Sequence, residues 1–471
     1  MSTVTRGIAL SSIAALALIA VSGCNVGPKY TRPQVPAPPT FRGADDAAIS
    51  SDPTLSIGDK KWSEVFREPE LQGYIQQALA NNYDVRVAVQ RVLEAQSQVR
   101  ITRAGQFPTV NAGGTGLGAE LPSSFGNSIA SPLTAGSLNL SAAWIPDFWG
   151  QYRKQTEAAR DQLLAQEWAR NAVRMTLVSQ VATSYFTLRS LDEQLLIAQS
   201  TLKARQDSVK LTSTLVNGGR APLSDLRQAE QLLYTTTSTI PSLEQQRQQQ
   251  ENTMRLLLGQ TPGTVTHTDA TALAPVPQDL PVGIPSQLLT RRPDIQQAEA
   301  QLKAANAQVG VARAAFFPSL SISFSGGFGG DTFGSLVDPS SRTIYGLGSL
   351  AQPIFAGGRI RGQYELSKQQ KEEMILTYQK TILTAFRDVS NALIAVNKQH
   401  ATREEQTKLV ASAQDATRLA RVRYQAGAAT YLEVLTTDSN LFSAQLNLIN
   451  AEQSEATSLV QLYQALGGGW Q

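Results

Sequence analysis

The sequence is poor in charge, cysteine and histidine. Charged residues make up 17% of the 471 residues, below the roughly 25% usual for soluble domains. The formal net charge is only +3 and no run of Lys or Arg occurs, so nothing indicates a nucleic-acid partner. The two histidines, His267 and His400, have no Cys or carboxylate at ligand spacing and suggest no Ser-His-Asp set. We therefore expect no metal, no cofactor and no enzymatic activity.

The single cysteine, Cys24, ends an N-terminal segment with a cationic start and an apolar run over residues 8–21. That run is shorter than the ~20 residues that cross a bilayer and is typical of a secretory signal. The V-S-G before Cys24 resembles a bacterial lipobox, and Asn25 after it resembles lipoproteins sorted to the outer membrane. We predict a signal peptide over residues 1–23 and a lipid, palmitate included, on Cys24. The alternative is an ordinary signal peptide with an incidental cysteine.

One lipid anchor holds a protein weakly, so another part of the chain must also engage the membrane. Residues 24–61 contain several prolines and predict an extended tether without its own core. Packed structure begins at Trp62. From about Glu70 to Gln106, valines at seven-residue intervals, with alanines between them, predict a helix with a coiled-coil seam.

Two strands and two long helices follow. Thr109–Glu120 is glycine-rich and Leu138–Ile145 alternates apolar with polar residues, which predicts a β-hairpin. From about Tyr152, apolar residues keep a strict interval of seven, at Val181, Leu188, Leu195, Leu202, Val209 and Val216. A helix of ~65 residues would be ~100 Å long. The return helix, about Pro222–Leu258, contains Pro241, where we expect a kink or an interruption.

Between these two helices, Leu215–Leu226 predicts the end of a helical hairpin. Asn217, Gly218 and Gly219 favour the left-handed conformation that ends a helix, and Pro222 suits the next first turn. A related hairpin end, Tyr424–Leu435, follows roughly 209 residues later. The alignment pairs Gly218 with Gly427, Leu223 with Leu432, and Leu226 with Leu435.

The whole first half is duplicated. After a proline-containing linker at residues 261–285, the chain repeats with an offset of roughly 210, so that Phe107-Pro108 matches Phe317-Pro318. Strands are predicted at Ser319–Ser325 and Arg342–Gln352, and the second half ends with two helices, the return one at about Tyr431–Leu466. Pro353 and Phe355 likewise repeat Pro146 and Phe148. We predict one repeat at residues 62–260 and the other at 286–471.

Four strands per chain predict an oligomer. An open sheet edge in lipid leaves unpaired N–H and C=O groups, so the strands must close with those of other copies. Three copies would give a twelve-stranded pore, whereas two would give eight strands, whose side chains nearly fill the interior. This favours a trimer, although the arithmetic also allows a tetramer. The predicted fold is a membrane α+β protein, a trimeric 12-stranded β-barrel continuous with a long periplasmic α-helical barrel.

Several motifs resemble one family. C-N-V-G-P-K-Y-T-R-P after the lipobox, two F-P-x-[VL] strand starts, P-I-F-A-G-G-R over residues 353–359 and the paired hairpin ends resemble the outer-membrane factors of the TolC superfamily, closest to the OprM/NodT-like lipoprotein branch. The resemblance covers essentially the whole mature chain. It implies a homotrimeric, passive duct for drugs or other small molecules in the Gram-negative outer membrane. The implied partners are outer-membrane lipid, a periplasmic adaptor (membrane fusion protein) and an inner-membrane pump, commonly of the resistance-nodulation-division type associated with multidrug resistance.

The resemblance also implies a gate, closed by tight packing of the inner helix pairs and opened when they splay. The family often carries Y-L-x-x-L-D at the second hairpin end, whereas here Thr436 stands in place of the Asp. The gate candidates are Leu432, Thr436, Asp438 and Asp225. Alternatively, Leu432 and Leu435 are interhelical core and Asp225 only favours its helix dipole. Candidates for adaptor contact are Gly218, Gly219, Arg220 and Gly427, although these glycines are also needed for the turns.

Two other functions remain open at this point. One is a duct of the same fold for type I protein secretion, which the hairpin and lumen sequences do not exclude. The other is a periplasmic coiled-coil lipoprotein, such as an adaptor, with no pore. An adaptor has β-rich modules flanking one helical hairpin, whereas this sequence predicts two hairpins and two alternating strand pairs, so the duct is favoured.

Overall fold

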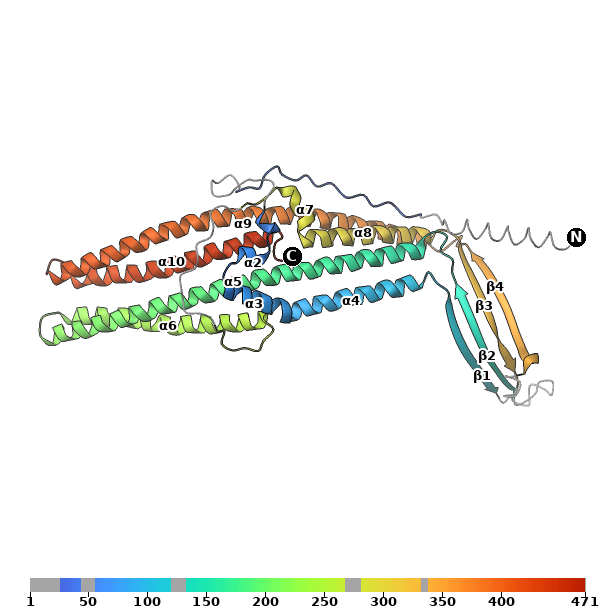
Figure 1. Ribbon diagram of the computed structural model, residues 1–471, viewed down its shortest axis with the longest axis horizontal. Coiled ribbons are helices and arrows are strands. Elements are labelled where there is room, and N and C mark those ends of the chain that lie inside the picture. The colour runs from blue at the N-terminus through green and yellow to red at the C-terminus, as the bar shows by residue number, and fades with distance from the viewer. Residues whose placement is uncertain (1–25, 44–55, 120–132, 267–280, 332–337, 471) are drawn as a thin grey trace. The chain divides into compact units, whose positions relative to one another are not determined.

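A computed structural model describes residues 26–43, 56–119, 133–266, 281–331 and 338–470 (Figure 1). The predicted signal peptide and Cys24 lie outside these ranges, as does His267. The chain divides into two compact units. Unit 1 comprises residues 1–34, 91–166 and 297–378, and unit 2 comprises residues 35–90, 167–296 and 379–471.

Unit 1 contains one antiparallel sheet of four strands, which lie in chain order (Figure 1). They are β1 (Thr109–Ala119), β2 (Leu133–Trp144), β3 (Ser319–Gly330) and β4 (Arg342–Ala351). The repeat boundary falls in the middle of the sheet, where Trp144 of β2 pairs with Ile322 of β3. The outer strands β1 and β4 therefore each keep one unpaired edge. All four predicted strands are confirmed.

The two faces of the sheet differ in polarity. Residues directly opposite one another in an antiparallel sheet share a face. The pairs Leu138↔Phe328, Ala142↔Phe324 and Leu320↔Leu350 lie on one face, which is apolar and largely exposed. The other face carries most of the serines, as in the pairs Ser141↔Ser325 and Ser321↔Ser349, although Tyr345 and Leu347 of β4 also lie there. A sheet with one apolar and one polar face suits a boundary between lipid and water.

The helices repeat in length as well as in order. Helices α4 (Tyr83–Ala104) and α8 (Pro293–Ala314) have 22 residues each. The long helices α5 (Gln151–Asn217) and α9 (Arg359–Gln425) have 67 residues each. The return helices α6 (Leu223–Leu257) and α10 (Tyr431–Ala465) have 35 each. The predicted duplication and the long helices are thus confirmed. No helix within the described ranges is long and apolar enough to cross a membrane.

Unit 2 contains an apolar core built on the predicted seven-residue spacing. Val181 and Leu188 of α5 and Ile382 and Val389 of α9 are almost fully buried. Tyr463 of α10 is buried with them and donates a hydrogen bond from its hydroxyl to the Lys60 carbonyl at 2.7 Å. Short elements complete the unit: η1 (Ile57–Asp59), α2 (Trp62–Val65), η3 (Pro285–Gln287) and α7 (Leu288–Arg291); η5 (Pro339–Ser341) precedes β4 in unit 1.

One helix prediction was wrong in detail, and one of the two outcomes expected at Pro241, an interruption, does not occur. The predicted helix from Glu70 to Gln106 is interrupted at Asn82, which separates α3 (Pro69–Asn81) from α4. The Asn82 side chain accepts hydrogen bonds from the N–H groups of Asp84 (2.8 Å) and Val85 (3.2 Å), as an N-cap does. Conversely, α6 continues through Pro241 without interruption. Ile240 and Leu243 pack there against Leu191 and Leu195 of α5, so packing maintains the helix.

Candidate functional site: a glutamine-lined groove and two hairpin ends

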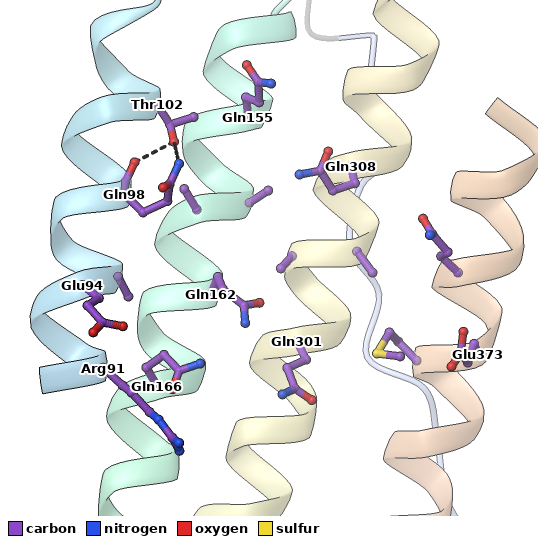
Figure 2. Close-up of a pocket in the computed structure, with 17 residues that line it drawn as sticks. Arg91, Glu94, Gln98, Thr102, Gln155, Gln162, Gln166, Gln301, Gln308 and Glu373 are labelled. Carbon is purple, nitrogen blue, oxygen red and sulfur yellow. Dashed lines mark hydrogen bonds between the residues drawn. The ribbon is translucent and has the colours of Figure 1, made fainter. Parts of the chain in front are cut away.

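A groove of about 940 Å³ crosses four helices of unit 1. Figure 2 shows side chains from α4, α5, α8 and α9 lining it. Seven of the lining residues are glutamines: Gln98, Gln155, Gln162, Gln166, Gln301, Gln308 and Gln370. Spacings of seven and four residues bring the α5 members onto one helix face, and the spacing of seven does the same on α8.

The groove presents amides rather than charges. A glutamine amide donates and accepts hydrogen bonds without carrying charge, so it can hydrogen-bond to water and to both neutral and charged solutes. Charged lining residues are few and of both signs: Arg91, Glu94 and Glu373. On α4 the Gln98 amide donates to the Thr102 hydroxyl at 3.4 Å, which fixes one lining side chain. The surface suits passage of solutes better than their retention.

The two hairpins of unit 2 end in the same backbone motif. In the first, the N–H of Gly219 donates to the Val216 carbonyl and that of Arg220 donates to Leu215, as in a Schellman helix end. In the second, Gly427 donates to Tyr424 and Ala428 to Arg423. Gly219 and Gly427 have φ of +67° and +74°, which disfavours a Cβ atom.

The predicted alignment of the two hairpin ends was wrong by one residue. The structural partner of Gly427 is Gly219, and Gly218 has no positive φ. Likewise α6 begins at Leu223 and α10 at Tyr431, so these two positions correspond. The sequence shows two adjacent glycines, and only the hydrogen bonds decide which of them ends the helix.

A charge network with one buried member, Arg205, joins the hairpins. Arg205 of α5 lies 3.2 Å from Asp438 of α10, measured from Nε to Oδ2, and Arg421 of α9 lies 3.0 Å from the other oxygen. The Arg205 side chain is only 5% exposed, and its Nη1 also donates to the Leu232 carbonyl of α6 at 2.9 Å. Arg205 further lies over the Phe442 ring. This single arginine thus contacts both α6 and α10.

Tyr431 makes a second link between the hairpins. Its hydroxyl lies 2.6 Å from the Ser208 hydroxyl and accepts a hydrogen bond from Thr212 at 3.1 Å, both on α5. Tyr431 also packs against Tyr424 of α9, with ring centroids 5.3 Å apart. Burial, followed by the nearby Asp225 carboxylate, raises the pKa of Tyr424 above its usual value. Both hairpins are therefore held together through apolar and polar contacts.

The gate candidates fall into different environments. Leu435 is 8% exposed and belongs to an apolar cluster with Val434 and Ala229, whereas Leu432 is 56% exposed. Leu435 is thus interhelical core, and Leu432 is not core within the chain. Thr436 turns its hydroxyl back to the Leu432 carbonyl at 2.8 Å. Asp225 lies in the first turn of α6.

Among the predicted site residues within the described ranges, the structure brings only Asp438 into this charge network. Arg220 and the three candidate glycines lie at exposed hairpin ends. Arg205 and Arg421 were missed by the sequence analysis, because they lie 233 and 17 residues from Asp438 and share no local pattern with it.

His400 was wrongly taken to have no carboxylate at ligand spacing. Its Nδ1 lies 2.7 Å from Glu455 and its Nε2 lies 3.5 Å from Glu404, four residues along the same helix. Arg403 approaches the second oxygen of Glu455 at 2.9 Å. The part of the chain that the structure covers contains no group of three or more potential metal ligands. The cluster, which contains the Arg403–Glu455 ion pair, lies within unit 2.

Comparison with known proteins decides the family. Residues 74–260 and 284–468 match the family model described as outer membrane efflux protein. The chain belongs to this family. It is 35% identical to the probable efflux pump outer membrane protein TtgC of Pseudomonas putida, over 98% of the chain and 96% of that protein. It is 33% identical to the cation efflux system protein CusC of Escherichia coli K12, over 96% and 97%.

Solved structures agree. A CusC crystal structure aligns with a TM-score of 0.82 at 31% identity, over 95% of this chain and all of that one. The open-state outer-membrane channel MtrE of Neisseria gonorrhoeae aligns with a TM-score of 0.84 at 29% identity, over 95% and 99%. The predicted family and fold, a trimeric channel with a four-stranded sheet per chain and a long helical barrel, are confirmed.

The predicted role is confirmed with the family. This outer membrane efflux protein is a passive duct of a tripartite efflux system in the Gram-negative outer membrane and not an enzyme. It acts as a trimer with an adaptor and an inner-membrane pump. The efflux function is thereby favoured over protein secretion and over a poreless adaptor.

Proposed function

We propose that the chain is a lipid-anchored efflux duct whose periplasmic end is held closed by the Arg205–Asp438–Arg421 network. The observation that carries the proposal is that these three charges join α5, α9 and α10 close to both hairpin ends. An ion pair with a buried member holds its partners firmly, because separating them leaves a charge unpaired in a dry environment. Opening then requires the hairpins to part at Asp438, with Leu432 and Thr436 lining the opening.

The lipid anchor, the type of pump and the adaptor contact complete the proposal. Cys24 carries the lipid and fixes the chain to the membrane after removal of residues 1–23, the tether runs to residue 61, and the repeats span 62–260 and 286–471. The pump is of the resistance-nodulation-division type. The adaptor touches the hairpin ends at Gly218, Gly219, Arg220 and Gly427, where the backbone is exposed and mostly free of bulky side chains.

The cargo is a broad range of small molecules delivered by the pump. Relatives with similar sequence identity to this chain have names that refer to antibiotic efflux, toluene efflux, cation efflux and pyoverdine export. A duct that passes such different solutes cannot have a lining of one charge sign, and the amide-lined groove fits that requirement. In the trimer this groove faces the lumen.

Deletion of the gene in the native host tests the proposal. Dye and antibiotic accumulation should rise in the deletion strain and return to normal with the wild-type chain. The same rise should follow deletion of the partner pump, with no further rise in the double deletion. Accumulation unchanged by the deletion, in a strain shown to produce the protein, would contradict an efflux role. A Cys24→Ala chain that still appears fully in outer-membrane fractions with bound palmitate would contradict the anchor.

A further inference from the structure

Unit 1 contains two equivalent corners where a strand meets a helix. In the first, the chain itself fills the corner. Trp149 stacks on Phe317 with ring centroids 4.7 Å apart, and its indole N–H donates to the Pro318 carbonyl at 2.7 Å. A cavity of about 200 Å³ remains beside them, lined by Phe148 and also by Pro353 and Ile360 from the turn after β4. This corner joins the end of β2, in the first repeat, to the start of β3, in the second.

The repeat places a second corner at the end of β4. Pro353 and Phe355 occupy the positions of Pro146 and Phe148. The backbone support is also duplicated, since the Trp144 indole donates to the Gln106 carbonyl and the Gln352 amide donates to the Phe316 carbonyl, both at 3.1 Å. The two corners are thus built on the same frame.

The second corner is open within one chain. Ile354 and Phe355 are 91% and 90% exposed, so both side chains stand almost wholly in solvent. Phe107 of the first repeat, which corresponds to Phe317 of the second, is also exposed. Phe107 precedes the edge strand β1, whereas Phe355 follows the opposite edge strand β4. No chain can bring both edges of its own sheet of four strands together.

We propose that a second copy of the chain completes this corner, with Ile354 and Phe355 of one copy packed against Phe107 and Pro108 of the next. The pairing of β2 with β3 inside the chain is the template for pairing β4 with β1 of the neighbour. The inference rests on trimeric assembly and is independent of the cargo and of the gate. It assigns to these residues the role of an apolar lock at the periplasmic end of each intersubunit strand pair.

The differences between the two corners support a neighbouring copy as the occupant. In the filled corner, Asp147 accepts a hydrogen bond from the Arg153 backbone at 2.8 Å and pairs with its side chain. The repeat puts Ile354 and Ile360 at these two positions, which replaces a charged pair with two apolar residues. Ala356 stands in place of Trp149 and leaves room. An incoming Phe107 ring would therefore meet the exposed Ile354 side chain, with space for it beside Ala356.

Crosslinking between engineered cysteines tests the contact. In Phe355→Cys/Phe107→Cys, a short bismaleimide should join neighbouring copies, so that denaturing gels show covalent dimers and trimers. The matched control is Phe148→Cys/Phe317→Cys. Its two cysteines lie in the filled corner of one chain, so they should crosslink within that chain and the protein should still run as a monomer on the gel. Each single-cysteine variant reports the background, native Cys24 included, and should remain monomeric on the gel.

Two results would overturn the lock while leaving the trimer in place. One is a trimer, shown intact by native mass spectrometry, whose Phe355→Cys/Phe107→Cys form gives no intersubunit product. The other is a fluorophore at Phe355→Cys that is quenched by spin-labelled lipids in vesicles, which would assign Ile354 and Phe355 to the bilayer instead. Absence of any trimer in the wild-type protein would overturn the assembly as well, whereas a conducting trimer without the crosslink would leave the channel intact and remove only the lock.

Discussion

Arg205 and Asp438 connect the two helical hairpins through an ion pair 3.2 Å long, in which the arginine is almost fully buried. The first residue belongs to one repeat and the second to the other, 233 positions apart. The pair thus couples the duplicated halves close to the ends at which a duct of this family must open. Any movement that separates the hairpins has to break it.

Asp438→Asn should loosen the hairpins. The amide keeps the shape of the carboxylate but leaves Arg205 buried without a counter-charge, and breaking such a pair costs about 3–5 kcal/mol. If the cost is about 3 kcal/mol, amide hydrogen exchange over residues 431–442 should accelerate by roughly 100-fold. The open probability of reconstituted channels should rise in parallel.

The control for this variant is Asp415→Asn. Asp415 pairs with Arg418 at 2.7 Å on the same long helix as Arg421, but both side chains are exposed. An exposed pair contributes about 0–1 kcal/mol, so exchange should change by less than about fivefold. Equal effects of the two variants would contradict a special role for the buried network.

Gly219→Ala and Gly427→Ala should each destabilise a hairpin end. Each glycine has a positive φ, and no other atom lies within 4 Å of an added Cβ, so the expected cost of about 1–2 kcal/mol comes from the backbone alone. Gly218→Ala, one residue away and without a positive φ, is the matched control and should be close to neutral. Hydrogen exchange at the hairpin ends measures all three. A Gly218 variant as damaging as the Gly219 variant would contradict the assigned turn.

Asp161 of α5 should make stability depend on pH. Burial, and then the neighbouring Glu157 carboxylate, raises its pKa to about 6, although Lys303 and Lys154 act in the opposite direction. The folded protein therefore binds a proton more tightly than the unfolded chain, so this contribution to stability is present below pH ~4 and is lost as pH rises towards 6. Asp161→Asn should raise Tm at pH 7.5 and leave it nearly unchanged at pH 4. A lower Tm at pH 7.5 would contradict this assignment.

The groove should set ion selectivity if it faces the lumen. Gln162→Glu/Gln308→Glu adds two carboxylates per chain on neighbouring helices (Figure 2). Reversal potentials measured across a salt gradient should shift towards the cation's Nernst potential, because like-charged walls concentrate counter-ions. Gln369→Glu, next to Gln370 but outside the groove lining, is the control. A selectivity unchanged by the double variant would place the groove away from the ion path.

Local patterns predicted most of the fold. The seven-residue spacing through Val181 and Leu188 identified α5, and unbroken alternation over Ser319–Ser325 identified β3, because each pattern follows the period of its element. The interruption at Asn82 was missed although the N-cap residue was visible, since the apolar spacing continues across it. The choice between Gly218 and Gly219 depends on the two hydrogen bonds that end the helix, which sequence spacing does not resolve.

Less of the candidate site could be predicted from the sequence. Asp438 was named as a charge near the second hairpin end, but its partners Arg205 and Arg421 come from two other helices. Only the packing of α5, α9 and α10 against one another brings the three together. The groove was missed for the same reason, since glutamines are frequent on exposed helix faces and only the structure shows that those of four helices share one surface.

Single-channel recording of the purified chain in planar bilayers tests the central claim most directly. A passive duct formed by three copies should give discrete ion-conducting openings without nucleotide, proton gradient or pump, and Asp438→Asn should lengthen them. A trimer, verified by native mass spectrometry in the same preparation, that inserts into the bilayer and never conducts, even as Asp438→Asn, would contradict the account.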